Sequence, residues 1–137
     1  MKPSKILARI AISSTAFAVL DSIWIGVVMK KFYNEQLGDL ARRNDRGMSP
    51  DWIAVILVYV VLVAGVNIFA VDTGPRKGRM KRSLVKGGLF GLISYGIYDL
   101  TNKATLKGWS WEMTVVDMAW GMVLCAIVAS VVAGVTE

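Results

Sequence analysis

The sequence predicts an all-α polytopic membrane protein: one integral membrane domain over residues 1–137, with four transmembrane helices in an antiparallel bundle. Hydrophobic residues make up 55% of the chain and the mean hydropathy is +0.52. Soluble domains are less apolar than this. Four apolar runs have close to the roughly 20 residues that a helix needs to cross a bilayer. The charged residues, with a net charge of +6, are concentrated between these runs.

The expected spans cover residues 6–29, 52–71, 84–102 and 113–135. The second carries Asn67 as its one strongly polar side chain. The third is the least apolar and has Lys86 near its start. Valine and isoleucine also favour buried strands, but the length of the runs and their lack of alternation favour helices. Strands of a membrane barrel would be about half as long and would alternate.

The first span has a second interpretation, as a cleavable signal peptide. A basic start, MKPSK, precedes the apolar run, and AFA at residues 16–18 resembles a signal-peptidase site. However, Arg9 and the polar residues 13–15 interrupt the run before that site. Cleavage would also leave an apolar segment, VLDSIWIGVVM, as the new N-terminus. The sequence therefore favours an uncleaved span.

The connectors predict the orientation of the chain. If the N-terminus is cytoplasmic, nine of the 16 lysines and arginines lie on the cytoplasmic side and seven lie outside. Six of the nine are clustered in residues 72–86. The positive-inside rule then places both termini in the cytoplasm. The short connector 103–112 contains Trp109 and Trp111, residues typical of membrane interfaces.

The long first connector, residues 30–51, leaves two structures open. Its segment FYNEQLGDLA is compatible with an ordinary polar loop. It is equally compatible with a short interfacial helix that turns Phe32, Tyr33, Leu37 and Leu40 toward the bilayer.

Three aspartates interrupt the apolar spans. Asp21, Asp99 and Asp117 are each expected roughly 6–12 Å from the same membrane face, at 1.5 Å of rise per residue. Inverting the topology would move all three together. Intramembrane carboxylates mark functional sites by default. Three close carboxylates cannot all ionise cheaply, so at least one should be protonated or share a cation. The structural alternatives for Asp99 are contact with headgroup water or a cap at residues 100–103. For the other two aspartates the alternative is helix-to-helix hydrogen bonds.

Each aspartate has a possible donor three residues later, on the same helix face. The indoles of Trp24 and Trp120 and the amide of Asn102 can donate to a carboxylate. Gly26 and Gly121 lie beyond the two Asp-Trp pairs, where small residues would allow close helix packing. The predicted ligand site in the outer half of the membrane comprises Asp21, Trp24, Tyr98, Asp99, Asn102, Asp117 and Trp120.

Composition also excludes several classes of function. With no histidine and with Cys125 as the one cysteine, the chain has no intrachain disulfide and lacks the ligands of a zinc site. The same composition excludes Ser-His and Cys-His catalysis. The basic stretches lack interleaved aromatic residues that would stack on bases, so no nucleic acid is expected. No cofactor or metal is assigned. The expected partners are membrane lipids, and a homodimer or another membrane protein stays open.

Several sequence blocks resemble the signature of a family of small bacterial four-helix inner-membrane proteins of unknown function. These blocks are LDSIWIG with FYNEQLG, then YDLTNKATLKGW, then DMAWG. They cover the first, third and fourth spans and their outer flanks. The resemblance implies a bacterial inner-membrane location and no particular activity. It adds these residues to the candidates: Phe32, Tyr33, Thr101, Thr105, Leu106, Gly108, Trp109 and Gly121.

Three classes of function stay open from the sequence. The first is binding or transport, in which an acidic-aromatic site takes a proton, a cation or a cationic small molecule. A transport pathway would need a homodimer, since four helices rarely enclose one. The second is an enzyme acting on a lipid or isoprenoid, with an aspartate as acid/base or magnesium ligand, although no D-x-x-D motif is present. The third is a non-catalytic accessory subunit.

Overall fold

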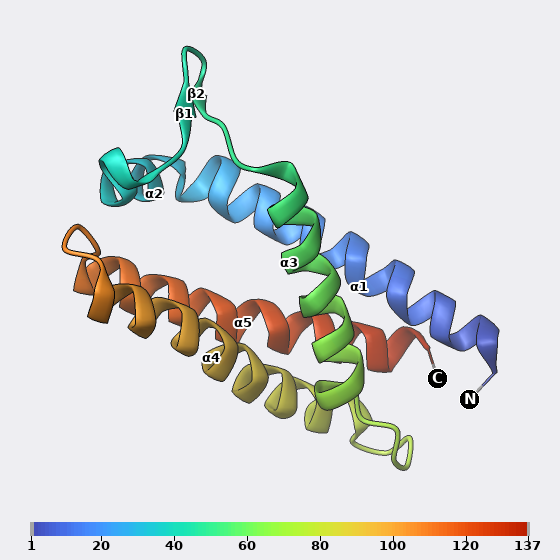
Figure 1. Ribbon diagram of the computed structural model, residues 1–137. Coiled ribbons are helices and arrows are strands. Elements are labelled where there is room, and N and C mark those ends of the chain that lie inside the picture. Colours follow the sequence, from blue (N-terminus) through green and yellow to red (C-terminus); the bar gives the residue numbers. More distant parts are fainter. Residues whose placement is uncertain (1, 137) are drawn as a thin grey trace.

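The computed structural model describes residues 2–136 and is predominantly helical (Figure 1). The first half of the chain contains two α-helices, two short helical turns and a hairpin. They are α1 (Pro3–Ile23), a π-helical turn (Trp24–Val28), α2 (Lys30–Leu37), a 3-10 turn (Gly38–Leu40), β1 (Arg43–Asn44) and β2 (Gly47–Met48). The second half contains α3 (Trp52–Gly65), a π-helical turn (Val66–Ala70), α4 (Arg79–Thr105) and α5 (Trp111–Val135).

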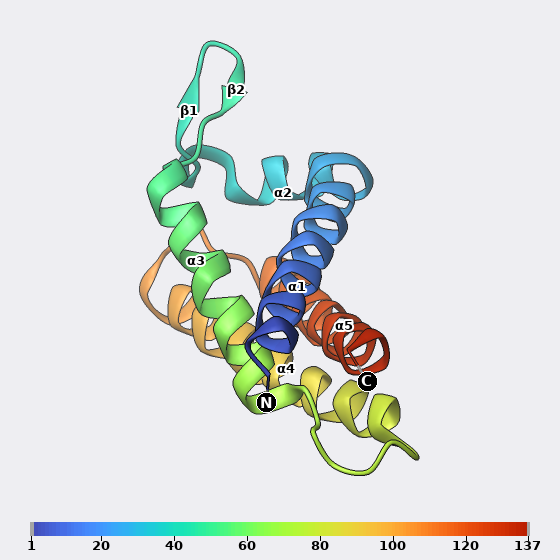
Figure 2. The same cartoon turned by 90° about the vertical axis from the view of Figure 1, so that its right-hand side faces the viewer.

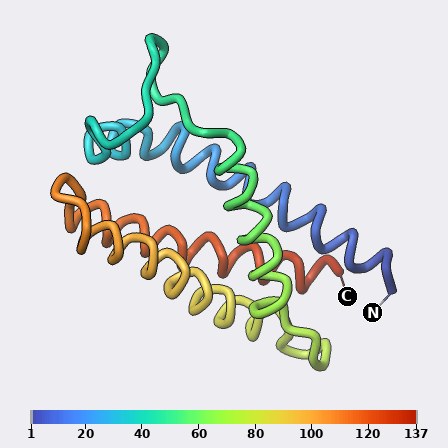
Figure 3. Tube along the Cα trace, in the orientation of Figure 1, coloured from blue at the N-terminus to red at the C-terminus, as the bar shows by residue number. Residues whose placement is uncertain are grey.

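Helices α4 and α5 lie side by side and run in opposite directions, while α1 packs along α5 and α3 crosses obliquely (Figures 1 and 2). The start of α1, the loop 71–78, the start of α4 and the end of α5 lie at one end of the molecule, here called the terminal end. Helix α2, the β1–β2 hairpin and the loop 106–110 lie at the opposite end, here called the hairpin end (Figure 3).

Local sequence explains where the helices begin. Pro3 occupies the first turn of α1, where its missing N–H is not needed. The Asp51 carboxylate caps α3 by accepting from the Ile53 and Ala54 N–H groups at 3.0 and 3.2 Å. The Ser110 hydroxyl caps α5 by accepting from the Met113 N–H at 2.9 Å. Side-chain oxygens at these positions satisfy donors that have no partner within the helix.

Three helical segments are long and apolar enough to cross a membrane: Pro3–Val28, Trp52–Ala70 and Trp111–Val135. They correspond to the first, second and fourth predicted spans. The predicted third span, 84–102, lies inside α4, which does not meet the same hydropathy criterion. Lysines and arginines crowd its first two turns, and Asp99, Asn102 and Lys103 lie near its end.

Apolar side chains on the outside of the protein agree with a lipid environment. Val27, Ile53 and Phe69 are each more than 70% exposed. The main core lies among α1, α3 and α5, around Phe17 and Leu124. A polar contact inside this core links α1 to the π-helical turn after α3. The Asn67 amide donates to the Ser13 hydroxyl at 2.9 Å and to the Val63 carbonyl at 2.8 Å.

Glycines bring α4 and α5 unusually close together. A Cβ on Gly91 would lie 2.0 Å from the Gly121 carbonyl oxygen, and one on Gly87 would lie 2.3 Å from the Cys125 carbonyl oxygen. Gly121 also seats the Tyr95 ring, which would be 2.2 Å from an added Cβ. The expectation of close packing is met at Gly121. It is wrong at Gly26, where nothing lies within 4 Å.

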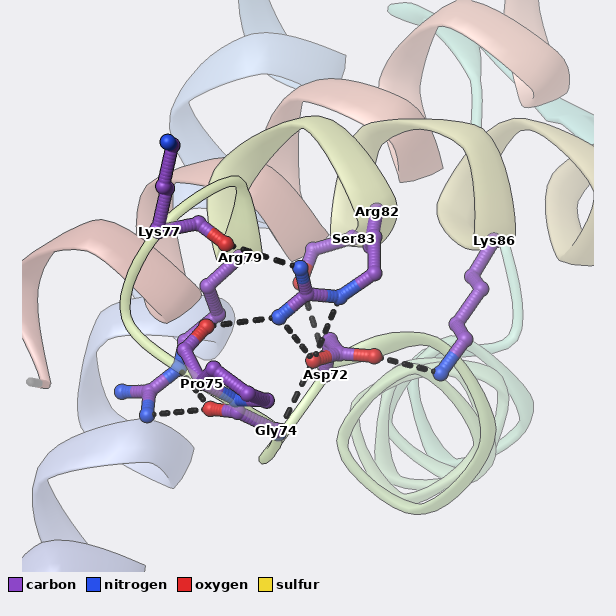
Figure 4. Close-up of polar contacts among 8 residues, drawn as sticks. All are labelled: Asp72, Gly74, Pro75, Lys77, Arg79, Arg82, Ser83 and Lys86. Atoms are coloured by element: carbon purple, nitrogen blue, oxygen red, sulfur yellow. Dashed lines mark hydrogen bonds and ion pairs between the residues drawn. The ribbon is translucent and has the colours of Figure 1, made fainter.

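Asp72 fastens the 71–78 loop to α4 at the terminal end (Figure 4). Its Oδ1 accepts from the Arg82 guanidinium at 3.0 and 3.1 Å and from the Gly74 N–H at 2.9 Å. Its Oδ2 pairs with the Lys86 ammonium at 2.7 Å. The pKa of the Asp72 carboxyl lies below its usual range. The largest cause is hydrogen bonding to Arg82, and the bonds to Lys86 and to the Gly74 N–H lower it further. One acid therefore pairs with two of the clustered cations.

Candidate functional site

The three predicted aspartates are all buried, and they come from three helices. Asp21 on α1 is 6% exposed, Asp99 on α4 is 0% exposed and Asp117 on α5 is 7% exposed. Among residues 2–136, none of the three forms an ion pair with lysine or arginine. Lys103, a possible counter-ion by sequence, donates to the Trp109 carbonyl at 2.9 Å and lies over the Trp111 ring.

Asp21 has two donors, and both come from other helices. The Trp120 indole N–H of α5 donates to Oδ1 at 2.8 Å, and the Tyr59 hydroxyl of α3 donates to Oδ2 at 2.6 Å. The carboxylate therefore joins α1, α3 and α5. This arrangement fits a structural junction whose acceptor atoms are used by the protein itself.

Asp117 is linked to Asp21 through a crossed pair of tryptophans. The rings of Trp24 and Trp120 stack with centroids 4.4 Å apart and planes 6° from parallel. Trp24 donates to the Tyr33 hydroxyl at 3.1 Å, and Tyr33 donates to Asp117 Oδ1 at 2.7 Å. Trp120 thus donates directly to Asp21 of α1, whereas Trp24 acts on Asp117 of α5 through Tyr33 of α2. The expectation that an indole would pair with the aspartate of its own helix is wrong, because helix rotation turns each Trp toward its neighbour.

Tyr33 reaches this network because the chain folds back after α1. The π-helical turn at residues 24–28 ends α1, and α2 then places Tyr33 against Trp109 and Met113. The segment is helical over Lys30–Leu37, as one of the two open structures predicted. Tyr33 is only 4% exposed, so its expected orientation toward the bilayer is wrong. Burial, followed by the nearby Asp117, raises the pKa of the Tyr33 hydroxyl. It is therefore a protonated donor at neutral pH.

Asp99 differs from the other two aspartates. Neither carboxylate oxygen has a donor among the described residues. The acidic group nearest in influence to it is the Asp117 carboxyl. Two carboxyl groups can share a hydrogen bond only when a proton lies on one of them. The alternative that Asp99 caps residues 100–103 is wrong, since its oxygens accept no backbone N–H.

Tyr98 and Asn102, the remaining predicted site residues, lie outside the hydrogen-bonded network. Tyr98 is 54% exposed and packs edge-on against Trp109, with ring centroids 5.6 Å apart. Asn102 is half-buried one helical turn after Asp99. Two network members were absent from the predicted ligand set. Tyr33 was marked only by the family resemblance. Tyr59 had as its sole signal a hydroxyl group in a strongly apolar span.

A groove of about 550 Å³ lies between α3 and α4 and reaches Asp117. Aliphatic side chains of α3 form one wall, and three of them (Leu57, Val58 and Val61) are each more than half exposed. Ser94, Tyr95 and Tyr98 of α4 form the other wall. An apolar molecule in the surrounding lipid could therefore approach a carboxyl group from the side.

Comparison with known proteins identifies a family. The family described as "Predicted membrane protein (DUF2177)" matches residues 6–134, nearly the whole chain. This match confirms the resemblance to an uncharacterised membrane protein family. No curated protein and no solved structure matches the chain.

Proposed function

We propose that the chain, which belongs to this family of predicted membrane proteins, binds the cationic group of an amphiphilic molecule. In this proposal the protein is a four-helix antiparallel bundle of the bacterial inner membrane with both termini cytoplasmic. The ligand enters the groove between α3 and α4 from the lipid. Its charged group meets Asp117.

The observation that carries the proposal is the Asp99–Asp117 pair. Asp99 is fully buried and its oxygens have no donor among residues 2–136. A purely structural carboxylate would be expected to have donors, as Asp21 has. Asp117 lines the groove, and its Oδ1 already accepts from Tyr33. Besides the Tyr33 hydroxyl, the pair therefore lacks a partner, which would be a cationic group or another donor.

Charge balance gives the proposed mechanism. Two adjacent carboxyls in an apolar site hold one negative charge more readily than two. The empty pair keeps a proton between Asp99 and Asp117. A bound cation takes the place of that proton, and the proton leaves. Tyr95 and Tyr98 offer aromatic faces that suit an organic cation. Binding of a cation and release of a proton are thus coupled.

Tetraphenylphosphonium binding to the purified protein tests this function at several pH values. We expect affinity to rise with pH, because a proton competes with the cation. Asp117→Asn should abolish binding while the protein stays folded, since the amide oxygen still accepts from Tyr33. Asp99→Asn should keep binding and lose most of the pH dependence. Equal, pH-independent binding by all three proteins would refute the proposal.

The apolar groove also favours the second candidate, an enzyme acting on a lipid or isoprenoid chain. In that case Asp117 would be the acid/base that faces the substrate and Asp99 would hold its proton. Incubation with membrane lipid extracts, followed by mass spectrometry, tests for turnover. A product that forms with the wild type and not with Asp117→Asn would favour the enzyme. Tight co-purification with a fixed protein, without either activity, would instead favour the accessory subunit.

A further inference from the structure

A second pocket lies at the terminal end, away from the aspartates and independent of the function proposed above. It has a volume of about 710 Å³. The start of α1, the 71–78 loop, the first residue of α4 and the end of α5 surround it. Its lining residues are four cations and two hydroxyls: Lys2, Lys5, Arg9, Arg79, Thr73 and Thr136.

Arg9 is the key residue of this pocket. It is only 7% exposed, and its Nε–H donates a hydrogen bond to the Thr136 hydroxyl oxygen at 3.2 Å. Among residues 2–136 it takes part in no ion pair. Removing a cation from water without an anion is costly. A largely buried arginine that lines a pocket, with no acid paired to it among residues 2–136, is placed to bind an anion that enters the pocket.

The other cations at this end are used differently. Arg82 and Lys86 both form ion pairs with Asp72 (Figure 4). Arg79 donates through Nε and Nη2 to the Gly74 carbonyl, a neutral acceptor, and so keeps its full charge. Helices α1 and α4 both begin at this pocket, at Pro3 and Arg79. Their N-termini add positive potential to that of the four cations.

We propose that this pocket binds a phosphate group, with the headgroup of an anionic phospholipid as its source. Guanidinium groups match phosphate oxygens with paired hydrogen bonds. Basic pockets between helices at the cytoplasmic membrane surface suit such headgroups. Beside Arg9, the exposed α1 residues Ile6, Leu7 and Ile10 offer an apolar surface for the acyl chains.

Native mass spectrometry of the full chain tests this site with phosphatidylglycerol, and with phosphatidylethanolamine as the zwitterionic lipid. Lys81→Gln is the matched control, since it removes an exposed α4 cation that does not line the pocket. We expect Arg9→Gln to weaken phosphatidylglycerol binding about tenfold, the loss expected for one charge-assisted hydrogen bond. The control should stay within about twofold of the wild type.

Two further measurements keep the proposal decidable. If Arg9→Gln does not fold, the double variant Lys2→Gln/Lys5→Gln removes two lining cations near the chain start and should also weaken binding.

Inorganic phosphate as a competitor separates the two possible sources of the phosphate group. Failure of phosphate to displace the lipid supports a headgroup site. Displacement at low millimolar phosphate would retain the phosphate site and overturn the lipid source. Equal phosphatidylglycerol binding by the wild type, both pocket variants and Lys81→Gln would overturn the site itself.

Discussion

At the scale of single residues, the three buried aspartates divide by their donors. Asp21 accepts two short hydrogen bonds, Asp117 accepts one from Tyr33, and Asp99 accepts none from the described residues. The same residue type therefore joins helices in one place and has no donor among the described residues in another.

This division predicts unequal effects of substitution on stability. Asp21→Ala leaves the Tyr59 hydroxyl and the Trp120 N–H without their acceptor, so we expect a loss of about 2–5 kcal/mol in the free energy of unfolding. Asp99→Asn removes a carboxylate with no protein donor and should change that free energy by less than about 1 kcal/mol. Thermal unfolding in detergent measures both. A larger loss in Asp99→Asn than in Asp21→Ala would contradict the assignment.

Asp72 predicts how stability depends on pH at the terminal end. Its cationic partners lower the pKa of the folded carboxyl, so its contribution is complete above the unfolded pKa of about 4. That contribution is lost as pH falls further toward the folded pKa. Melting temperatures of the wild type and of Asp72→Asn should therefore differ at neutral pH. They should converge as pH falls below about 4. A constant difference across that range would show that the ion pairs do not contribute.

The sequence indicated the depth of the three aspartates but not their partners. Depth follows from counting residues along a helix. Partners depend on the rotation of each helix about its axis, which a span of nearly uniform apolarity does not determine. The crossed Trp24 and Trp120 donors and the Tyr59 contact therefore needed three-dimensional coordinates.

At the scale of elements, composition identified the three most apolar helices well. Helix α4 was harder, because its helical length comes partly from tertiary packing through glycines. Residues 32–41 were left open between a loop and a helix. Helix α2 forms there, and its Tyr33 packs with Trp109 and Met113. The short hairpin β1–β2 was not predicted at all.

The α4–α5 interface predicts a contrast between two glycines of the same helix. A Cβ at Gly91 would meet backbone at 2.0 Å, whereas one at Gly88 would have its nearest contact at 3.7 Å. Gly91→Ala should therefore destabilise the protein by about 1–3 kcal/mol, the usual cost of overpacking. Gly88→Ala should be neutral or slightly stabilising, since alanine favours helix. Thermal unfolding of both variants in one detergent makes the comparison. Equal melting temperatures would mean that the helices are not in close contact.

At the scale of the whole molecule, several polar side chains are buried while many large apolar side chains are exposed, and the two ends differ. Exposed surfaces of the long helices are apolar, while aspartates and Arg9 lie inside. The terminal end carries the Asp72 cluster and the basic pocket. The hairpin end carries the α2 contacts, including a hydrogen bond between Ser110 and Gln36. The two ends of the molecule therefore carry different polar groups.

Cysteine labelling in cells tests both the crossing of α4 and the orientation. In a Cys125→Ala background, single cysteines replace the exposed residues Asp45, Lys77 and Lys107. Lys77 is preferred to its neighbour Gly78, whose φ of +76° would strain any other residue. We expect a membrane-impermeant maleimide to label positions 45 and 107 in intact cells. Position 77 should react only after permeabilisation, because basic connectors stay in the cytoplasm. Labelling of 77 and 107 from the same side would show that α4 does not cross, whereas a fully reversed pattern would keep the four spans and invert the orientation.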